Sequence, residues 1–282
     1  MSATTVEYES RGRRYLRYML IYVILALVLF PVFWIVVSSL KPPENIFTTP
    51  PQVLPEKPVL VHYQKFVSGP LASYFLNSLY VTIGATISSV ALSVLAGYGW
   101  AKFEFRGSLF TSTVVILSRI FPIVVILVPL FQILRGFGLI NTHPGLIVSF
   151  YVYTLPLTSW MLKGFFENIP DNVLRAARID GFSELQIFLR IVIPMVKPGI
   201  IATALFSVTI AWQELLFSIT FLQDSELYTM PVGLLNLTNQ FQIQWGLMMA
   251  TSFIFMAPIA VLFILSQKYF IQGIKGGSGG AL

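Results

Sequence analysis

Long apolar stretches with at most one charged residue each dominate the hydrophobic and polar pattern of the chain. Six of them approach or exceed the roughly 20 apolar residues that a helix needs to cross a membrane. Helices satisfy their own backbone hydrogen bonds in lipid, and the stretches lack the alternation of barrel strands. We therefore predict an all-α polytopic membrane protein with six transmembrane helices. The predicted spans are residues 16–38, 75–101, 109–134, 143–162, 199–222 and 246–269.

Composition supports a membrane protein. The chain has 282 residues, of which 56% are hydrophobic and only 11% are charged, whereas soluble domains carry about 25% charged residues. The first apolar run, residues 18–37, follows a basic segment as in a signal peptide. It is too long for a signal core and lacks a small-residue cleavage site, so we interpret it as an uncleaved span.

Lysine and arginine positions predict the orientation, because cytoplasmic segments of membrane proteins are enriched in both. If the N-terminus is cytoplasmic, four of these residues fall outside: Lys41, Lys57, Lys65 and Arg135. Thirteen fall inside: Arg11, Arg13, Arg14, Arg17, Lys102, Arg106, Lys163, Arg175, Arg178, Arg190, Lys197, Lys268 and Lys275. Both termini are therefore predicted to be cytoplasmic.

Three segments outside the spans differ in composition. Residues 39–74 form a proline-rich outside loop that favours extended or polyproline-like structure. This loop is either a surface for a partner or a connector laid along the protein. Residues 163–198 form a cytoplasmic loop that is long for a simple connection. The glycine-rich tail, residues 273–282, is predicted to be flexible.

The cytoplasmic loop has the pattern of a short amphipathic helix. Asp171 is a candidate cap for its free amides, and Gly181 fits its end. A second helix is expected over 183–193, interrupted by Pro194 and Pro198 before the fifth span. The first helix either lies on the membrane surface or docks to a soluble partner. Its apolar side would carry Val173, Leu174, Ala177 and Ile179, and its polar side Arg175, Arg178 and Asp180.

The spacing within this loop resembles a known motif. Ala176-Ala177-x-x-x-Gly181, then nine residues, then Ile191-x-Ile193-Pro194 resembles the EAA loop of permeases from binding-protein-dependent ABC importers. The segment ARIDGFSELQIFLRIVIPMVKPG is similar to the version in sugar importers. The likeness to the smaller, six-span permease of maltose-type carbohydrate importers covers nearly the whole chain. It extends to FWIVVSSLKPPENIF, YFLNSLYVTIGAT, AGYGWAKFEFRG, LPLTSWMLKGFFENIP, WQELLF and MPVGL.

The resemblance implies a type I ABC importer permease fold, with residues 1–282 as one permease domain in a prokaryotic inner membrane. It implies ATP-driven carbohydrate uptake through a pore of which this chain forms half. The implied partners are a second homologous permease, two ATP-binding cassette subunits, an extracytoplasmic solute-binding protein, membrane lipid and a sugar substrate.

Coupling to the ATPase is implied for the residues of the motif. One of them departs from the family, because Arg175 stands where the motif has its Glu. A guanidinium is not a neutral replacement for a carboxylate, so either the ATPase carries a compensating acid or Arg175 points elsewhere. The implied coupling residues are Arg175, Ala176, Ala177, Arg178, Asp180, Gly181, Ile191, Ile193 and Pro194.

The sequence contains no ATP site of its own. A G-x-x-x-x-G-K-[ST] loop is absent, and Gly97-Tyr98-Gly99 is better explained by close helix packing. We predict a transport subunit rather than an enzyme, with no cofactor in this chain and with ATP and Mg bound by the partner ATPase. There are no cysteines and only two histidines, His62 and His143, so no metal site is expected.

Two charges fall in the interior of predicted spans, whereas Arg17 and Lys268 lie at span ends. Arg119 lies about 11 residues, or roughly 17 Å, into the third span and so near the membrane midplane. Such an arginine needs a partner or water, and three roles stay open: a structural anchor, a contact with substrate, or a contact with the partner permease. Glu214 in the fifth span is a conceivable ion-pair partner.

Trp212, Gln213 and Glu214 offer the aromatic and polar groups that bind sugars. Interfacial anchoring is the alternative for the tryptophan. Together with Arg119, these three residues form the predicted substrate path.

Two other classes of protein fit less well. An ion-coupled secondary transporter of a small polar solute would need relay charges in several spans, and only Arg119 and Glu214 are available. A membrane-embedded enzyme would need a catalytic cluster, which the spans lack. The sequence does not name the substrate.

Overall fold

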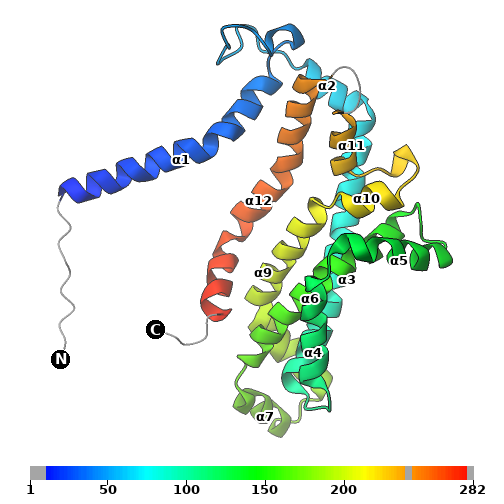
Figure 1. Ribbon diagram of the computed structural model, residues 1–282. Helices are drawn as coiled ribbons and strands as arrows, with labels where there is room; N and C mark the ends of the chain where they lie inside the picture. The colour runs from blue at the N-terminus through cyan, green and yellow to red at the C-terminus, as the bar shows by residue number, and fades with distance from the viewer. Residues whose placement is uncertain (1–10, 239–242, 278–282) are drawn as a thin grey trace. The chain divides into compact units, whose positions relative to one another are not determined.

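A computed structural model describes residues 11–238 and 243–277, and all regular structure among them is helical (Figure 1). The chain forms two compact units. One takes in the chain up to Gly69 and from Leu237 to Ile254, and the other takes in Pro70–Asn236 and the chain from Phe255 onward. The all-α prediction is confirmed.

The first unit contains α1 (Arg11–Ser39), η1 (Pro43–Asn45), α2 (Val61–Ser68) and the first residues of α12 (Trp245–Gly277). Helix α1 contains the predicted first span. The expectation of an extended loop over 39–74 is wrong in its second half, because α2 lies within it and the next helix begins at Pro70.

A buried lysine organises the irregular part of this loop. Lys41 is only 1% exposed. Its Nζ donates a 2.6 Å hydrogen bond to the Gln52 carbonyl and lies 4.6 Å from the centroid of the Trp34 ring. The Lys41 carbonyl lies 3.0 Å from Nε2 of buried His62. The loop is therefore a fixed structure held by Lys41.

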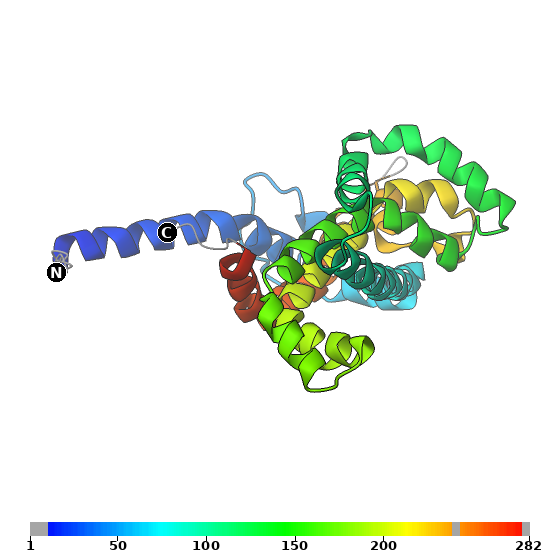
Figure 2. The ribbon, with the colours of Figure 1, turned by 90° about the horizontal axis from the view of Figure 1, so that it is seen from below.

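Helices α3 (Pro70–Lys102), α6 (His143–Glu167) and α9 (Ile193–Trp212) pack side by side in the second unit (Figures 1 and 2). Small residues permit this close approach, as is usual in membranes. A Cβ on Gly97 would lie 2.9 Å from the backbone nitrogen of Lys163 on α6. Gly97 thus has the predicted packing role, whereas Gly99 has open space around it.

Hydroxyl pairs join the same three helices. The Ser93 and Thr158 hydroxyls lie 2.6 Å apart and join α3 to α6, while those of Ser89 and Ser207 lie 3.1 Å apart and join α3 to α9. All four side chains are fully buried. Thr158 and Ser89 also donate to backbone carbonyls of their own helices. The two pairs thus supply a hydrogen-bond partner to Ser93 and Ser207 in the apolar interior.

The predicted third span is broken. It consists of α4 (Ser108–Leu117), η2 (Ser118–Ile120) and α5 (Ile123–Gly136), with a bend of 108° between the two halves (Figure 1). Pro122 has no N–H to continue the helix, and it favours the extended conformation found at Phe121. The described residues thus contain five helices long and apolar enough to cross a membrane, or six if the bent pair is one span.

The fifth span differs from the prediction at both ends. It begins with α8 (Glu184–Ile187), continues through a π-helical turn η3 (Phe188–Val192) into α9, and ends at Trp212. The prolines do not interrupt it. Pro194 follows the π turn, whose wider spacing relieves the clash between a proline ring and the preceding turn. Helix α10 (Leu216–Phe221) is separate.

The remaining elements complete the described chain. η4 (Ser225–Leu227) and α11 (Met230–Asn236) follow α10. Helix α12 contains the predicted sixth span and continues to Gly277. The predicted flexible tail is therefore helical over 273–277, while residues 278–282 lie outside the described part.

Candidate coupling surface and substrate pocket

A short helix forms within the predicted cytoplasmic loop. Helix α7 (Asp171–Ile179) begins directly after Pro170. It ends where Gly181 adopts φ +82°. The Phe182 amide donates to the Ala177 carbonyl and the Gly181 amide to the Arg178 carbonyl, which is the Schellman pattern. Gly181 is thus needed for its left-handed backbone, and it fits the predicted helix end.

One face of α7 is fixed to the rest of the second unit. Leu174 and Ala177 are each 4% exposed. They join a core of side chains from the neighbouring ends of the long helices: Tyr98 of α3, Leu162 and Phe166 of α6, Ile187 of α8, and Val192 and Val196. Helix α7 therefore packs directly on the three packed helices.

The opposite face of α7 is free. Asn172, Arg175, Ala176 and Ile179 are all exposed, and their spacing places them on one stripe of the helix. Two expectations are corrected here. Ile179 does not belong to the buried side, since it is 86% exposed, and Ala177 is buried in the chain's own core, where a partner cannot reach it.

A lysine outside the predicted site fixes the start of α7. Lys102, the last residue of α3, donates from Nζ to the Ile169 carbonyl at 2.7 Å and to Asp171 Oδ1 at 2.9 Å. The hydrogen bond and charge of Lys102 hold the pKa of Asp171 below its usual value. Asp171 therefore does not cap α7 as predicted. No local sequence signal could reveal this contact, since 69 residues separate its members.

The end of α7 is tied to α8. Arg178 forms a two-point ion pair with Glu184, at 2.7 Å from Nε and 3.2 Å from the guanidinium NH2 group. Ser183 and Gln186 form a capping box at the start of α8. The Ser-x-x-Gln spacing signals this box in the sequence. The polar contact predicted for Arg178 is thus made within the chain.

The second half of the motif serves packing. Ile191 and Ile193 are partly buried against the core that holds Leu174 and Ala177, and Pro194 is exposed near the start of α9. Asp180 is exposed at the C-terminal end of α7. Of the nine predicted coupling residues, only Arg175 and Ala176 lie exposed on the free stripe.

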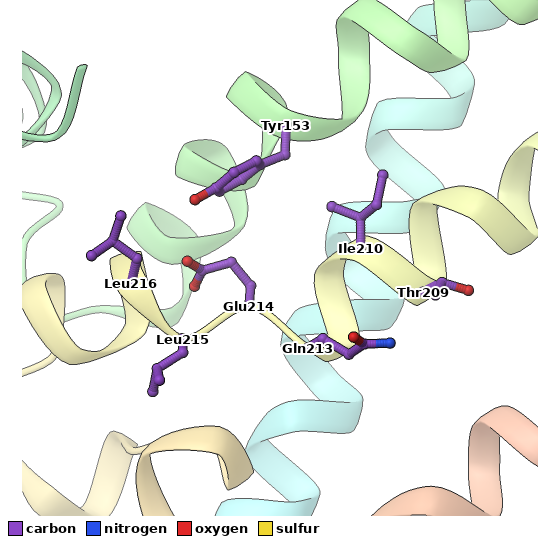
Figure 3. A pocket seen from close by; sticks show the side chains of 7 residues that line it. All are labelled: Tyr153, Thr209, Ile210, Gln213, Glu214, Leu215 and Leu216. Carbon is purple, nitrogen blue, oxygen red and sulfur yellow. The ribbon is translucent and has the colours of Figure 1, made fainter. Parts of the chain in front are cut away.

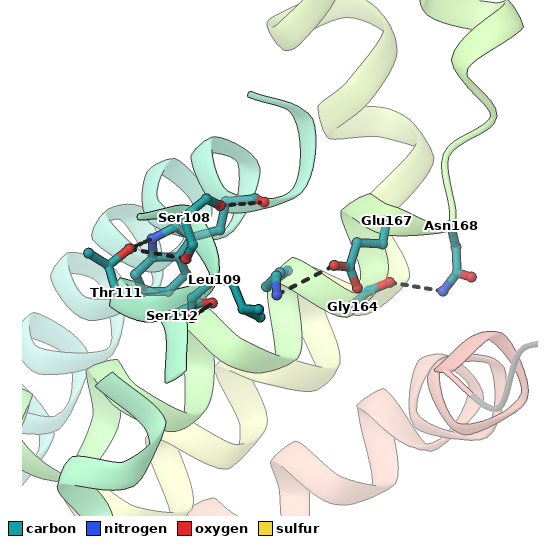
Figure 4. Close-up of polar contacts among 9 residues, drawn as sticks. Ser108, Leu109, Thr111, Ser112, Gly164, Glu167 and Asn168 are labelled. Atoms are coloured by element: carbon teal, nitrogen blue, oxygen red, sulfur yellow. Dashed lines mark hydrogen bonds and ion pairs between the residues drawn. The ribbon is translucent and has the colours of Figure 1, made fainter. Parts of the chain in front are cut away.

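Beside α7, the ends of α3 and α6 meet α4 around a pocket of about 860 Å³ whose lining includes Lys102 and Asp171. Lys163 forms an ion pair with Glu167 at 3.5 Å, and the Asn168 side chain donates to the Gly164 carbonyl (Figure 4). On α4, Thr111 accepts a hydrogen bond from Trp100. These contacts consolidate the end of the unit on which α7 sits.

A second pocket lies where α9 ends. It measures about 360 Å³ and opens between α6 and the break that follows Trp212 (Figure 3). Tyr153 reaches into it from α6, on the same side as the Glu214 carboxylate. The lining residues are Tyr153, Thr209, Ile210, Gln213, Glu214, Leu215 and Leu216.

Glu214 is held by the start of α10. Its carboxylate accepts hydrogen bonds from the Phe217 amide at 2.7 Å, and from the Ser218 amide and hydroxyl at 3.1 Å each. These donors satisfy a side chain that is only 7% exposed. Glu214 thus lies in a helix break rather than within a span, and it fixes the wall of the pocket.

Trp212 does not line this pocket. It is 3% exposed, its ring stacks on Phe255 at 4.8 Å between centroids, and its Nε1 donates to the Phe255 carbonyl at 3.0 Å. Trp212 is thus packed inside the chain rather than in the pocket, and its place in the substrate path stays a prediction. Exposed Gln213 remains available to a ligand.

Arg119 lies at the bend between α4 and α5. It is exposed, and within residues 11–238 and 243–277 it makes no ion pair with Glu214 or with another side chain. The conceivable pairing is therefore wrong. In the same residues no group of three or more His, Asp or Glu gathers that could hold a metal ion.

Comparison with known proteins gives a consistent result. Residues 89–276 match the family described as "Binding-protein-dependent transport system inner membrane component". The chain is 32% identical to the sulfoquinovosyl glycerol permease SmoH of Agrobacterium fabrum, over 93% of this chain and 92% of that one. It is 30% identical to the trehalose/maltose permease MalG of Thermococcus litoralis, over 89% and 91%.

The fold also matches a solved structure. A chain from a bacterial ABC transporter that imports the acidic polysaccharide alginate superposes with a TM-score of 0.81, at 20% identity, over 93% of this chain and 99% of that one. The predicted importer permease fold is confirmed by this match.

The helical membrane fold and the family match define a transport component. The chain belongs to the binding-protein-dependent transport system inner membrane component family. It is a multi-pass inner-membrane permease subunit of an ABC importer, and ATP binding belongs to the partner ATPase. An ion-coupled secondary transporter and a membrane enzyme are thereby excluded.

Proposed function

We propose that the chain is one of two homologous permeases of a carbohydrate importer. The observation that carries this proposal is that two relatives, SmoH and MalG, both transport a sugar or sugar derivative, namely sulfoquinovosyl glycerol and trehalose or maltose. In this proposal both termini are cytoplasmic, and a solute-binding protein delivers substrate on the other side.

We propose further that α7, within the 163–198 loop, is the ATPase-coupling helix. Its buried face is fixed to α3, α6 and α8, while its free stripe offers Arg175 and Ala176 to a partner. Because α7 is fixed rigidly, its displacement by the closing ATPases would move the attached helices. The two permeases would then alternate between inward-facing and outward-facing arrangements.

In the proposed substrate path, the pocket beside Glu214 supplies the polar contacts. Gln213, Tyr153 and Thr209 offer an amide, a phenol and an aliphatic hydroxyl, which suit sugar hydroxyls. Glu214 positions this wall. We assign Arg119 to the interface with the second permease, because an exposed arginine in lipid costs at least ~2.5 kcal/mol without a partner.

Uptake by the reconstituted complex tests the carbohydrate proposal. The permease pair, the ATPase and the binding protein would be placed in proteoliposomes and offered radiolabelled mono-, di- and trisaccharides, with amino acids as controls. ATP-dependent uptake of a sugar alone is expected. Uptake of amino acids with no sugar transported would contradict the carbohydrate assignment while leaving the family membership intact.

A further inference from the structure

Some charged residues of α7 form ion pairs within the chain, and one does not. Asp171 is paired with Lys102 and Arg178 with Glu184, so both charges are neutralised inside the chain. Arg175 is exposed and forms no hydrogen bond or ion pair with any residue in 11–238 or 243–277. Its charge contributes to the lowered pKa of Asp171 one turn earlier, but its guanidinium is left without a hydrogen-bond partner on the free stripe.

An apolar side chain accompanies this charge. Ile179 lies one turn after Arg175 on the same stripe and is 86% exposed, with Ala176 beside it. The Schellman turn at Gly181 and the Arg178–Glu184 pair hold the end of the helix, so the position of Ile179 is defined. The stripe thus presents the positive charge of Arg175, the small side chain of Ala176 and the large apolar side chain of Ile179.

We propose that the ATPase groove receiving α7 carries a carboxylate opposite Arg175 and an apolar pocket for Ile179. This inference rests on the proposed coupling role of α7. A buried or half-buried guanidinium at an interface needs an acid, whereas a like charge opposite it weakens binding strongly. The acid should lie directly opposite Arg175, between the negative charges of Asp171 and Asp180 at the two ends of α7.

The experiment is a binding measurement on the full permease pair in detergent with its cognate ATPase. Arg175→Glu is expected to weaken ATPase association by roughly tenfold or more, and Arg175→Gln by less. The loss should shrink between about 0.05 M and 0.5 M NaCl, since added salt screens charge repulsion. Arg135→Glu is the matched control, because Arg135 is exposed at the end of α5 and away from α7, and this change should have little effect.

Rescue identifies the complementary acid. Acidic residues of the ATPase groove would be changed to Arg one at a time, and one of them should restore binding to Arg175→Glu. Equal binding of wild type and Arg175→Glu, or a loss that does not respond to salt, would overturn the carboxylate. Unchanged binding of Ile179→Asp would overturn the apolar pocket.

The Ala176→Trp variant distinguishes a failure of the proposed carboxylate from a failure of the proposed coupling role of α7. If Ala176→Trp blocks ATPase binding while Arg175→Glu does not, α7 docks but without an acid opposite Arg175. If neither variant affects binding, the coupling role of α7 itself fails. Thermal unfolding of each purified variant confirms that its fold is retained.

Discussion

The Nζ atom of Lys102 lies 2.9 Å from Oδ1 of Asp171 and joins the last residue of α3 to the first residue of α7. The same ammonium group holds the Ile169 carbonyl. A long helix and the proposed coupling helix are thus connected by one side chain. We expect this connection to carry motion between them.

Replacing Lys102 should uncouple transport from hydrolysis. In Lys102→Met the packing stem remains but both hydrogen bonds are lost, so α7 still docks yet moves α3 less. We predict normal ATPase co-purification and a several-fold fall in sugar transported per ATP hydrolysed, measured in proteoliposomes. Loss of co-purification would instead make Lys102 a determinant of docking.

The same contact predicts a pH response. Because Lys102 lowers the pKa of Asp171, the ion pair is complete above the usual Asp pKa and is lost only as pH falls through the lowered value. The difference in coupling between wild type and Asp171→Asn should therefore stay constant from about pH 6 to 8. A difference that vanished within this range would show that the pair is not formed.

Gly97 and Gly99 form a matched pair for helix packing. A Cβ on Gly97 would meet the α6 backbone at 2.9 Å, whereas one on Gly99 would meet nothing within 4 Å. Backbone cannot yield easily, so Gly97→Ala should cost about 1–3 kcal/mol of stability. Gly99→Ala should be neutral or slightly stabilising. Thermal unfolding in detergent measures both, and equal melting temperatures would contradict the close α3–α6 approach.

Glu214 should matter for structure as well as for transport. Glu214→Ala leaves the Phe217 and Ser218 amides without their acceptor, which should cost about 1–3 kcal/mol. Gln213→Ala removes an exposed amide and should leave stability unchanged while weakening uptake. If Gln213→Ala transported normally, this residue would not belong to the substrate path.

Arg119 tests the proposed contact with the second permease. We predict that Arg119→Leu reduces recovery of the second permease in a pull-down, because its exposed guanidinium lacks a partner among the described residues of its own chain. Arg135→Leu, an exposed arginine at the end of α5, is the control. Full assembly of Arg119→Leu with lost uptake would return Arg119 to the substrate path.

Local signals in the sequence predicted much of the fold. The length of the apolar runs correctly predicted the first, second, fourth and sixth spans. Gly181 correctly predicted the end of α7, because a residue in the left-handed conformation is needed there. Pro122 could have indicated the break in the third span. The apolar residues on both sides of it instead favoured the prediction of one continuous span. Pro194 and Pro198 were expected to interrupt a helix, but the helix continues through them, because a π turn precedes Pro194.

The candidate site was less predictable because its contacts are non-local. Nothing near Lys102 in the sequence shows that it meets Asp171, and nothing near Trp212 shows that Phe255 covers it. Ile179 shows a different limit. Its apolar side chain predicted burial, but its position on α7 places it on the exposed stripe. There we propose that it enters an apolar pocket of the ATPase.

Cross-linking from α7 tests the central proposal most directly. The chain has no cysteine, so Ala176→Cys or Ala177→Cys introduces a single thiol into this subunit. With a short thiol-to-amine cross-linker on the assembled complex, exposed position 176 should join the ATPase, and buried position 177 should not. The absence of any ATPase adduct from position 176, in a complex that still hydrolyses ATP and transports, would contradict the assignment of α7 as the coupling helix.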